Sequence, residues 1–390
     1  MRIWKVLLII IILMCPMPSS AEETSTEGIL NSYSEMYGDI FEEGLNSIEG
    51  ENVFLNTIPD FSPHDILKRL NSGEFVISAK ELTTYVLRLL LGEVYDSAKL
   101  MAIILVLAVL CSYLSSLKSG FADSTIADCA FYVCYIIISG VAAAAFYSAA
   151  ESASETVSNI AFFMRIIVPV MITALMTSGA IISATTLEPV LLSIVEATVW
   201  IIDAVFVPAV MISTALNVVN GMSDKFKTDR MVSLLNNSVK WGLSILLTIF
   251  VSLAGLNSIA SSGVDGLTVK LSKFAAANLI PMVGGILSES VETVMSCSVV
   301  IKNSVGILGV ICLVAIALGP ALKIAAVLIL FRITAAVAEP ISEPKIITCI
   351  SRLAGSVSSL FSMIAAVTVM FILVITIMIN AGSSAVLLGR

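Results

Sequence analysis

The chain has 390 residues, of which 58% are hydrophobic and 13% are charged, and its mean hydropathy is +1.01. A soluble domain of this length carries about 25% charged residues, so a soluble protein is excluded and a lipid-facing surface is indicated. The formal net charge of -8 arises in residues 22–95, where acidic side chains far outnumber basic ones. This acidity argues against nucleic acid or anionic lipid as a partner of that segment.

Residues 1–21 are expected to be a cleavable signal peptide. Arg2 and Lys5 precede a short apolar run, and small residues up to Ala21 form a signal-peptidase site. The alternative is an uncleaved anchor, but the apolar run falls short of the about 20 residues that span a bilayer. Cleavage places residues 22–95 outside the cytoplasm.

Residues 22–95 are expected to form an acidic extracytoplasmic helical segment. Ser62 and Pro63 are typical of a helix start, and residues 78–81 form a capping box that begins a second helix. The second helix is expected to lie along the membrane before the first span. The segment contains no cysteine and therefore no disulfide framework, so docking onto a partner or the membrane is favoured over independent folding.

The rest of the chain predicts an all-α polytopic membrane protein with six to eight transmembrane segments. Clear spans are expected near residues 99–117, 129–150, 189–219, 241–260, 303–331 and 353–381. Residues 96–159 are assigned to a first transmembrane hairpin, and residues 160–273 and 274–390 to the halves of a twofold repeat. A shift of 112 residues places Pro169 on Pro281, Pro208 on Pro320 and Lys240 on Arg352, although chance matching in an apolar sequence is an alternative.

Two apolar segments, 160–187 and 274–301, are interrupted by residues that disfavour an ordinary span: Pro169, Ser178-Gly179, Pro281, Gly284-Gly285, Glu289 and Glu292. Such interruptions at matching positions in two halves are a pointer to a substrate path in transporters. The basic loops 221–240 and 332–352 both favour the cytoplasm. Both interrupted segments are therefore expected to be broken or re-entrant, with eight crossings and an inverted repeat as the alternative.

Charged residues inside the apolar block are the candidate functional residues. Glu196 and Asp203 lie seven residues apart and so share a helix face, and Lys323 on a later span is the expected counter-charge. Together with Glu289 and Glu292 they form a candidate polar pathway. The alternative is a structural pair that holds two helices together. Arg165 is expected to extend to an interface.

No enzyme, cofactor or metal site is expected. The single histidine, His64, follows Pro63 in the first turn of a helix, so histidine-based triads and zinc motifs cannot be built. The cysteines lack metal-binding spacing and are expected to act as small apolar residues. Any ATP-driven action would need a separate ATPase subunit.

Residues 278–309, NLIPMVGGILSESVETVMSCSVVIKNSVGILG, resemble the stage III sporulation protein AE family of endospore-forming bacteria. The resemblance extends to the signal peptide, the acidic segment and the polytopic block. It implies a multi-pass subunit of the membrane complex between mother cell and forespore, a channel or secretion system needed for forespore gene expression. The extracytoplasmic segment would then face the intermembrane space.

The partners implied by the resemblance are the other stage III sporulation operon proteins, among them a secretion-type ATPase, small membrane subunits and ring-forming proteins. Membrane lipid is a further partner and nucleic acid is not. Faces rich in Gly and Ala, such as residues 140–145, permit close helix packing within a chain or in a homo-oligomer. The alternative functions are a structural membrane scaffold that anchors the ring proteins and a stand-alone secondary transporter.

Overall fold

The computed structural model describes residues 26–47, 62–71, 79–116, 124–222, 228–252 and 284–381. All regular secondary structure in these ranges is helical, which confirms the all-α class. The N-terminal helices are α2 (Thr26–Asn46), α4 (Pro63–Asn71) and α5 (Ala79–Ser116). They are followed by α6 (Ser124–Thr177), α7 (Ile181–Ile201), the π-helical turn η2 (Ile202–Phe206), α8 (Val207–Met222), the helix Asp229–Ser252, α10 (Gly284–Ala338) and α11 (Pro344–Asn380). The expected signal peptide, residues 1–21, lies outside the described residues.

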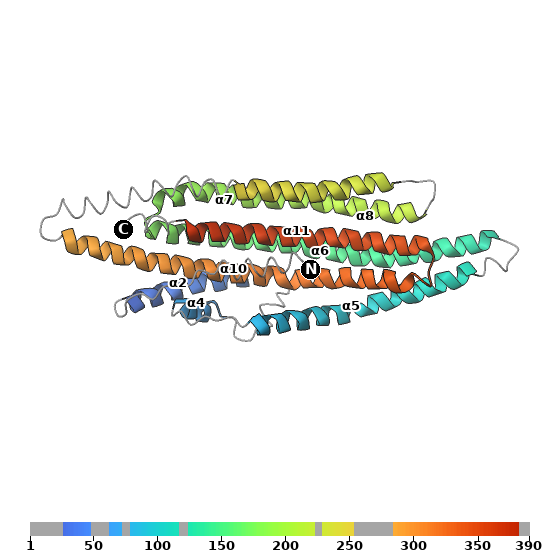
Figure 1. Cartoon of the computed structure of the whole chain (residues 1–390), viewed down its shortest axis with the longest axis horizontal. Coiled ribbons are helices and arrows are strands. Elements are labelled where there is room, and N and C mark those ends of the chain that lie inside the picture. Colours follow the sequence, from blue (N-terminus) through green and yellow to red (C-terminus); the bar gives the residue numbers. More distant parts are fainter. Residues whose placement is uncertain are drawn as a thin grey trace.

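Six apolar rods form the bundle, in agreement with the six clear spans expected from the sequence. Among the described residues, five stretches are long and apolar enough to cross a membrane, and α5 adds a sixth if its two parts, which meet at a bend of 40° next to Asp96, count as one span. Helices α7 and α8 join through η2 into one rod, Ile181–Met222. Figure 1 shows successive rods running in opposite directions along the long axis of the molecule.

The longest helices are much longer than a bilayer is thick. Helix α6 has 54 residues and α10 has 55, and at a rise of 1.5 Å per residue each is about 80 Å long. The hydrocarbon core of a membrane is about 30 Å thick. Each helix therefore extends well beyond the membrane that it crosses.

Helices α6, α10 and α11 pack against one another to form the centre of the bundle. Two glycines of α10 make this packing close, because a Cβ on Gly306 would meet Ile379 of α11 and one on Gly309 would meet Ile167 of α6. The neighbouring Leu308 and Ile375 are completely buried. The middle of the bundle is thus filled by apolar side chains.

Residues 160–187 form a helix–turn–helix with the predicted break at Ser178-Gly179, and its two arms are the last turns of α6 and the first turns of α7. The re-entrant course of this segment stays a prediction. Pro169 lies inside α6, and the carbonyl of Pro169 accepts a hydrogen bond from Thr173 Oγ1 at 2.9 Å. Proline is tolerated in a packed apolar helix because neighbouring helices and hydroxyl groups compensate the interrupted backbone.

Residues 284–301 also belong to a long helix and not to a re-entrant segment. They form the first part of α10, which continues without interruption through the expected span 303–331. Residues 274–283, including Pro281, lie outside the described residues. The expected repeat stays a prediction, and its matched prolines Pro208 and Pro320 lie in different surroundings, since Pro208 follows the π-helical turn and Pro320 lies within α10.

The N-terminal helices α2 and α4 form a small hairpin that packs on α10 and, through α2, on α6. His64 Nε2 of α4 lies 3.2 Å from Asp39 Oδ1 of α2, and its ring lies over Gly38, where any side chain would collide with it. Leu67 is almost fully buried, and Phe41 of α2 contacts Phe163 of α6 with ring centroids 6.1 Å apart. The segment was expected to dock onto a partner or the membrane. Its described helices α2 and α4 instead dock onto the bundle of the same chain.

The exposed surface changes character halfway along the bundle. Exposed side chains of α6 are mainly apolar up to Tyr147 and mainly polar from Glu151 onward. The apolar ones include Tyr132, Val133, Ile136 and Ile137, and the polar ones are Glu151, Glu155, Ser158, Arg165, Thr173 and Thr177. On the rod α7–α8 the contrast is weaker, because α7 exposes both polar and apolar residues, whereas α8 exposes apolar ones. The exposed residues of α7 include Thr185, Thr186, Ser193 and Glu196 beside Ile181 and Trp200, and those of α8 include Ile212, Ala215, Val219 and Met222.

These two regions also differ in charge. We call residues 97–150, 203–252 and 323–360 the basic half, and residues 151–202, 284–322 and 361–381 the acidic half. The acidic half carries Glu151, Glu155, Glu188, Glu196, Glu289 and Glu292 against Arg165 and Lys302. The basic half carries ten Lys and Arg against seven Asp and Glu, and among its described residues Arg230 and Lys345 lie in the first turns of their helices.

Exposed aromatic side chains border the apolar surface of the basic half. On α5 they are Tyr95 and Tyr113, and on α6 they are Tyr132 and Tyr147, with exposed fractions between 39% and 81%. The spacing of each pair corresponds to about 27 Å on α5 and about 22 Å on α6 at the helical rise. Belts of Tyr and Trp at such a separation are typical of the two interfaces of a bilayer. The pattern indicates that the basic half faces lipid.

Candidate functional site: a polar seam between α6 and α7

A turn at Ser178–Ala180 brings α6 and α7 together as an antiparallel pair. Gly179 has a φ of 88°, a left-handed conformation that glycine adopts without steric cost. The side chain of Ser178 is buried and its Oγ donates to the carbonyl of Leu175 at 2.7 Å. Residues at similar distances before and after this turn therefore face one another across the two helices.

Arg165 and Glu196 form a bidentate ion pair across this pair of helices. Arg165 Nε donates to Glu196 Oε1 at 2.6 Å, and Nη2 donates to Oε2 at 3.2 Å. Both side chains remain about half exposed. The expectation that Arg165 extends to an interface stays a prediction, and the structure adds that its guanidinium pairs with a carboxylate on the neighbouring helix.

Asp203 makes a second polar contact between α6 and the rod formed by α7 and α8. Ser154 Oγ of α6 donates to Asp203 Oδ1 at 2.7 Å. Asp203 lies in η2, where the Val207 N–H donates to the carbonyl of Ile202 five residues earlier. Pro208 follows directly and lacks an N–H, and a proline ring clashes with the carbonyl four residues before it in a regular α-helix. A wider π turn relieves that clash, and such turns are frequent at functional sites.

The π-helical turn is supported from the other side by the helix Asp229–Ser252. A Cβ on Gly242 would come within 2.8 Å of the ring of Phe206, so the absence of a side chain lets this helix approach η2. Ser213 Oγ of α8 donates to Asn236 Oδ1 at 2.9 Å and joins the same two rods. The turn that carries Asp203 is therefore fixed by contacts with α6 on one side and with the helix Asp229–Ser252 on the other.

The structure separates Lys323 from Glu196 and Asp203. Lys323 is exposed on α10, and α10 packs on α5, α6 and α11, whereas α7 packs on α6. Figure 1 shows α6 and α11 between α10 and the rod formed by α7 and α8. The cation that meets Glu196 is Arg165 and not Lys323. We call Ser154, Arg165, Glu196 and Asp203 the polar seam.

Glu289 and Glu292 lie in the first turns of α10. Their helix positions are described, and their side-chain contacts lie outside the described part of the structure. They belong to the acidic half, as does the seam's ion pair.

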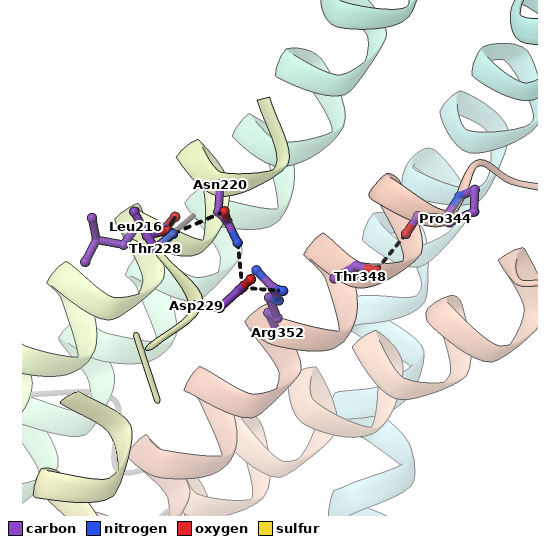
Figure 2. A network of polar contacts seen from close by, with 7 residues as sticks. All are labelled: Leu216, Asn220, Thr228, Asp229, Pro344, Thr348 and Arg352. Carbon is purple, nitrogen blue, oxygen red and sulfur yellow. Dashed lines mark hydrogen bonds and ion pairs between the residues drawn. The ribbon is translucent and has the colours of Figure 1, made fainter. Parts of the chain in front are cut away.

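A second polar network, which the sequence did not predict, lies at the turns of the basic half (Figure 2). Arg352 Nη2 of α11 lies 2.6 Å from Asp229 Oδ1. Asn220 Nδ2 of α8 donates to the same oxygen at 2.7 Å, and the Thr228 N–H donates to Asn220 Oδ1 at 3.5 Å. These contacts join α8, the helix Asp229–Ser252 and α11.

The described residues contain no group of three or more His, Cys, Asp or Glu side chains that could hold a metal ion. The seam offers a bidentate ion pair and a hydrogen-bonded carboxylate, both exposed on the outside of the bundle. Such a surface can attract and exchange hydrated ions or polar groups.

The fold and these sites define a multi-pass helical membrane protein with one half that exposes mainly apolar side chains and one half that exposes polar and acidic ones. Residues 61–382 match the family model of stage III sporulation protein AE. The chain is 30% identical over 368 residues to "Stage III sporulation protein AE" of Bacillus subtilis (strain 168), covering 93% of this chain and 88% of that protein. No solved structure matches the chain.

The chain therefore belongs to the stage III sporulation protein AE family. This is a family of sporulation membrane proteins and not a known family of enzymes. The resemblance seen in residues 278–309 is confirmed.

Proposed function

We propose that the chain is a channel- or permease-like subunit of the membrane complex that joins mother cell and forespore during endospore formation and supports forespore gene expression. The observation that carries this proposal is the polar seam. It starts with Asp203, at the outer edge of the apolar surface, and continues along the acidic half to Glu196. A charged stripe at that place suits a path for polar solute that continues from the membrane outward.

The path proposed here lies between the chain and a neighbour. Buried side chains fill the space between α6, α10 and α11, and the three helices approach one another closely at Gly306 and Gly309. The seam, in contrast, is exposed on the outside of the bundle. A second copy of the chain or another subunit of the complex would supply the opposite wall.

The orientation proposed for the chain follows from its charge. Cytoplasmic loops of membrane proteins carry an excess of Lys and Arg, so the turns of the basic half face the cytoplasm and the acidic half faces the intermembrane space. A secretion-type ATPase would then meet the basic end. Ring-forming proteins would meet the acidic half and the hairpin of α2 and α4.

Neutral substitutions in the seam test the proposal. The variant with both Glu196→Gln and Asp203→Asn should reduce the yield of heat-resistant spores while the amount of protein in the membrane stays normal. Glu151→Gln is the matched control, since Glu151 is also exposed on the acidic half of α6 and lies outside the seam. A normal spore yield from the double variant would contradict a conducting role.

A structural scaffold is the second candidate function, and the Arg165–Glu196 pair favours it, because a paired carboxylate is also what a helix-joining contact requires. The double variant Arg165→Glu, Glu196→Arg separates the two functions. It keeps the pair and reverses the positions of its charges. A scaffold would tolerate this exchange, whereas a conducting surface would lose activity.

A further inference from the structure

We propose that the cavity between α8 and α11, at the turns of the basic half, binds the headgroup of an anionic glycerophospholipid. The cavity has a volume of about 180 Å³ and is lined by Asn217, Asn220, Lys345, Thr348 and Arg352, among others. A water molecule takes about 30 Å³ in the liquid, and pockets for drug-sized ligands start at about 300 Å³. The space therefore suits a headgroup and not a large solute.

A buried acceptor in this cavity points to a ligand that donates a hydrogen bond. Asn217 is 2% exposed, and its Oδ1 has no hydrogen-bond partner in the described structure. A buried polar atom left without a partner is costly and rare in folded proteins. The oxygen itself has almost no accessible surface, so a hydroxyl group on a ligand in the cavity would satisfy it after a rotation of the Asn217 amide.

The charged lining points to an anion. Lys345 and Arg352 both line the cavity, and Asp229 contacts Arg352 from the neighbouring helix. The cavity also includes Pro344, the first residue of the 37-residue helix α11. Pro344 has no N–H, and the N–H groups of Ile346 and Ile347 donate to the carbonyl of Glu343, so the helix contributes chiefly the positive end of its dipole, which favours phosphate. The ligand therefore combines a phosphate with a hydroxyl donor.

The position of the cavity favours a lipid as the source of this phosphate. Val219 and Met222 of α8 are exposed beside it, and so is Ile341 in the turn that precedes α11. Acyl chains could lie along these apolar side chains while the headgroup enters the cavity. Basic pockets between helices on the cytoplasmic side of a membrane are known sites for anionic headgroups.

Thermal unfolding of the full chain, purified in detergent, tests the proposal. A ligand that binds the folded state raises the midpoint of unfolding, and the rise grows with the logarithm of the ligand concentration relative to its dissociation constant. We expect phosphatidylglycerol, which carries a phosphodiester and two hydroxyl groups, to raise the midpoint. Phosphatidylcholine and soluble glycerol 1-phosphate should not. Native mass spectrometry of the same samples should count the bound phosphatidylglycerol.

Two variants locate the site. Lys345→Gln should weaken the apparent affinity for phosphatidylglycerol about fivefold, the effect of one basic side chain at an anionic membrane surface. Asn217→Ala removes the buried acceptor and should weaken it about two- to tenfold, the effect of one hydrogen bond. Lys240→Gln is the control, because Lys240 is exposed on the helix Asp229–Ser252 and does not line the cavity.

The outcomes separate the sources of the ligand. Equal effects of phosphatidylglycerol on the original chain, Lys345→Gln and Asn217→Ala would overturn the proposal, as would an absence of any effect on the original chain. Glycerol 1-phosphate that acts as strongly as the lipid would overturn the lipid as the source. If a variant unfolds before any lipid is added, the bound-lipid count on the other variant decides.

Discussion

Helix α6 passes through two environments without interruption. Their comparison shows that an apolar sequence does not by itself mean that a helix contacts lipid. Both halves of the helix are rich in apolar residues. The basic half exposes residues such as Ile136 and Ile137, whereas the acidic half buries its apolar residues and exposes Arg165 and Thr173. The residues that a helix exposes, and not its mean hydropathy, identify the part that faces lipid.

Helix α10 contains an even longer apolar stretch that does not face lipid. Its acidic half is almost entirely apolar between Lys302 and Lys323, yet these residues are mostly buried against α6, α11, α2 and α4. Even Lys302 is fully buried, and its Nζ donates to the carbonyl of Ala381 at 2.5 Å. A hydropathy profile alone would assign this stretch to the membrane.

The largest expected effect comes from a charge placed on the lipid-facing side of α6. Ile137→Lys would put an ammonium group near the middle of the hydrocarbon core, at a cost of about 2.5–3.5 kcal/mol for insertion. The amount of protein in the membrane fraction should fall. Thr173→Lys, on the exposed side of the same helix in the acidic half, is the matched control and should leave that amount unchanged. Equal amounts of the two variants would remove the distinction between the halves.

Close packing in the acidic half predicts a smaller effect. A Cβ on Gly309 would collide with Ile167, so Gly309→Val should destabilise the chain by about 1–3 kcal/mol, the usual cost of overpacking. Gly140 in the basic half has open space around it, and Gly140→Val should leave the stability nearly unchanged. The midpoint of thermal unfolding in detergent measures both variants. A Gly309→Val chain as stable as the original would mean that α6 and α10 do not pack this closely.

The smallest effect is expected at the ion pair of the seam. Arg165 and Glu196 are about half exposed, and exposed ion pairs contribute about 0–1 kcal/mol. Glu196→Gln should therefore lower stability by no more than this. The difference should vanish near 1 M salt, where the Debye length is about 3 Å. A larger and salt-independent loss would show that the pair lies in a low-dielectric environment, and so that lipid or protein covers the acidic half.

The sequence predicted the number of rods and missed their length. The apolar runs of the sequence identified the six described rods, because residues that face lipid and residues buried inside the bundle are both apolar. Pro169 and the two glutamates of α10 were interpreted as interruptions of a span. Long helices nevertheless form there, because packing against neighbouring helices compensates a proline, and the two glutamates lie in the first turns of α10.

The polar seam was predictable in part. Glu196 and Asp203 were identified by their charge, and the break at Gly179 was visible. Arg165 precedes Gly179 by 14 residues and Glu196 follows it by 17, so treating the break as a hairpin turn would have paired them. The separation of Lys323 from these acids was not predictable, because the arrangement of helices around the bundle depends on packing between distant parts of the chain.

Labelling of introduced cysteines in intact cells tests where the two halves of the bundle lie. In the proposed orientation the apolar surface of the basic half lies in lipid and the acidic half lies outside the cytoplasm. A membrane-impermeant maleimide should therefore label Ser158→Cys and Thr173→Cys from outside, fail to label Ile137→Cys, and label Ser233→Cys only after permeabilisation. Peptide mass analysis separates these sites from the native cysteines. External labelling of Ile137→Cys together with protection of Ser158→Cys would contradict the proposed orientation.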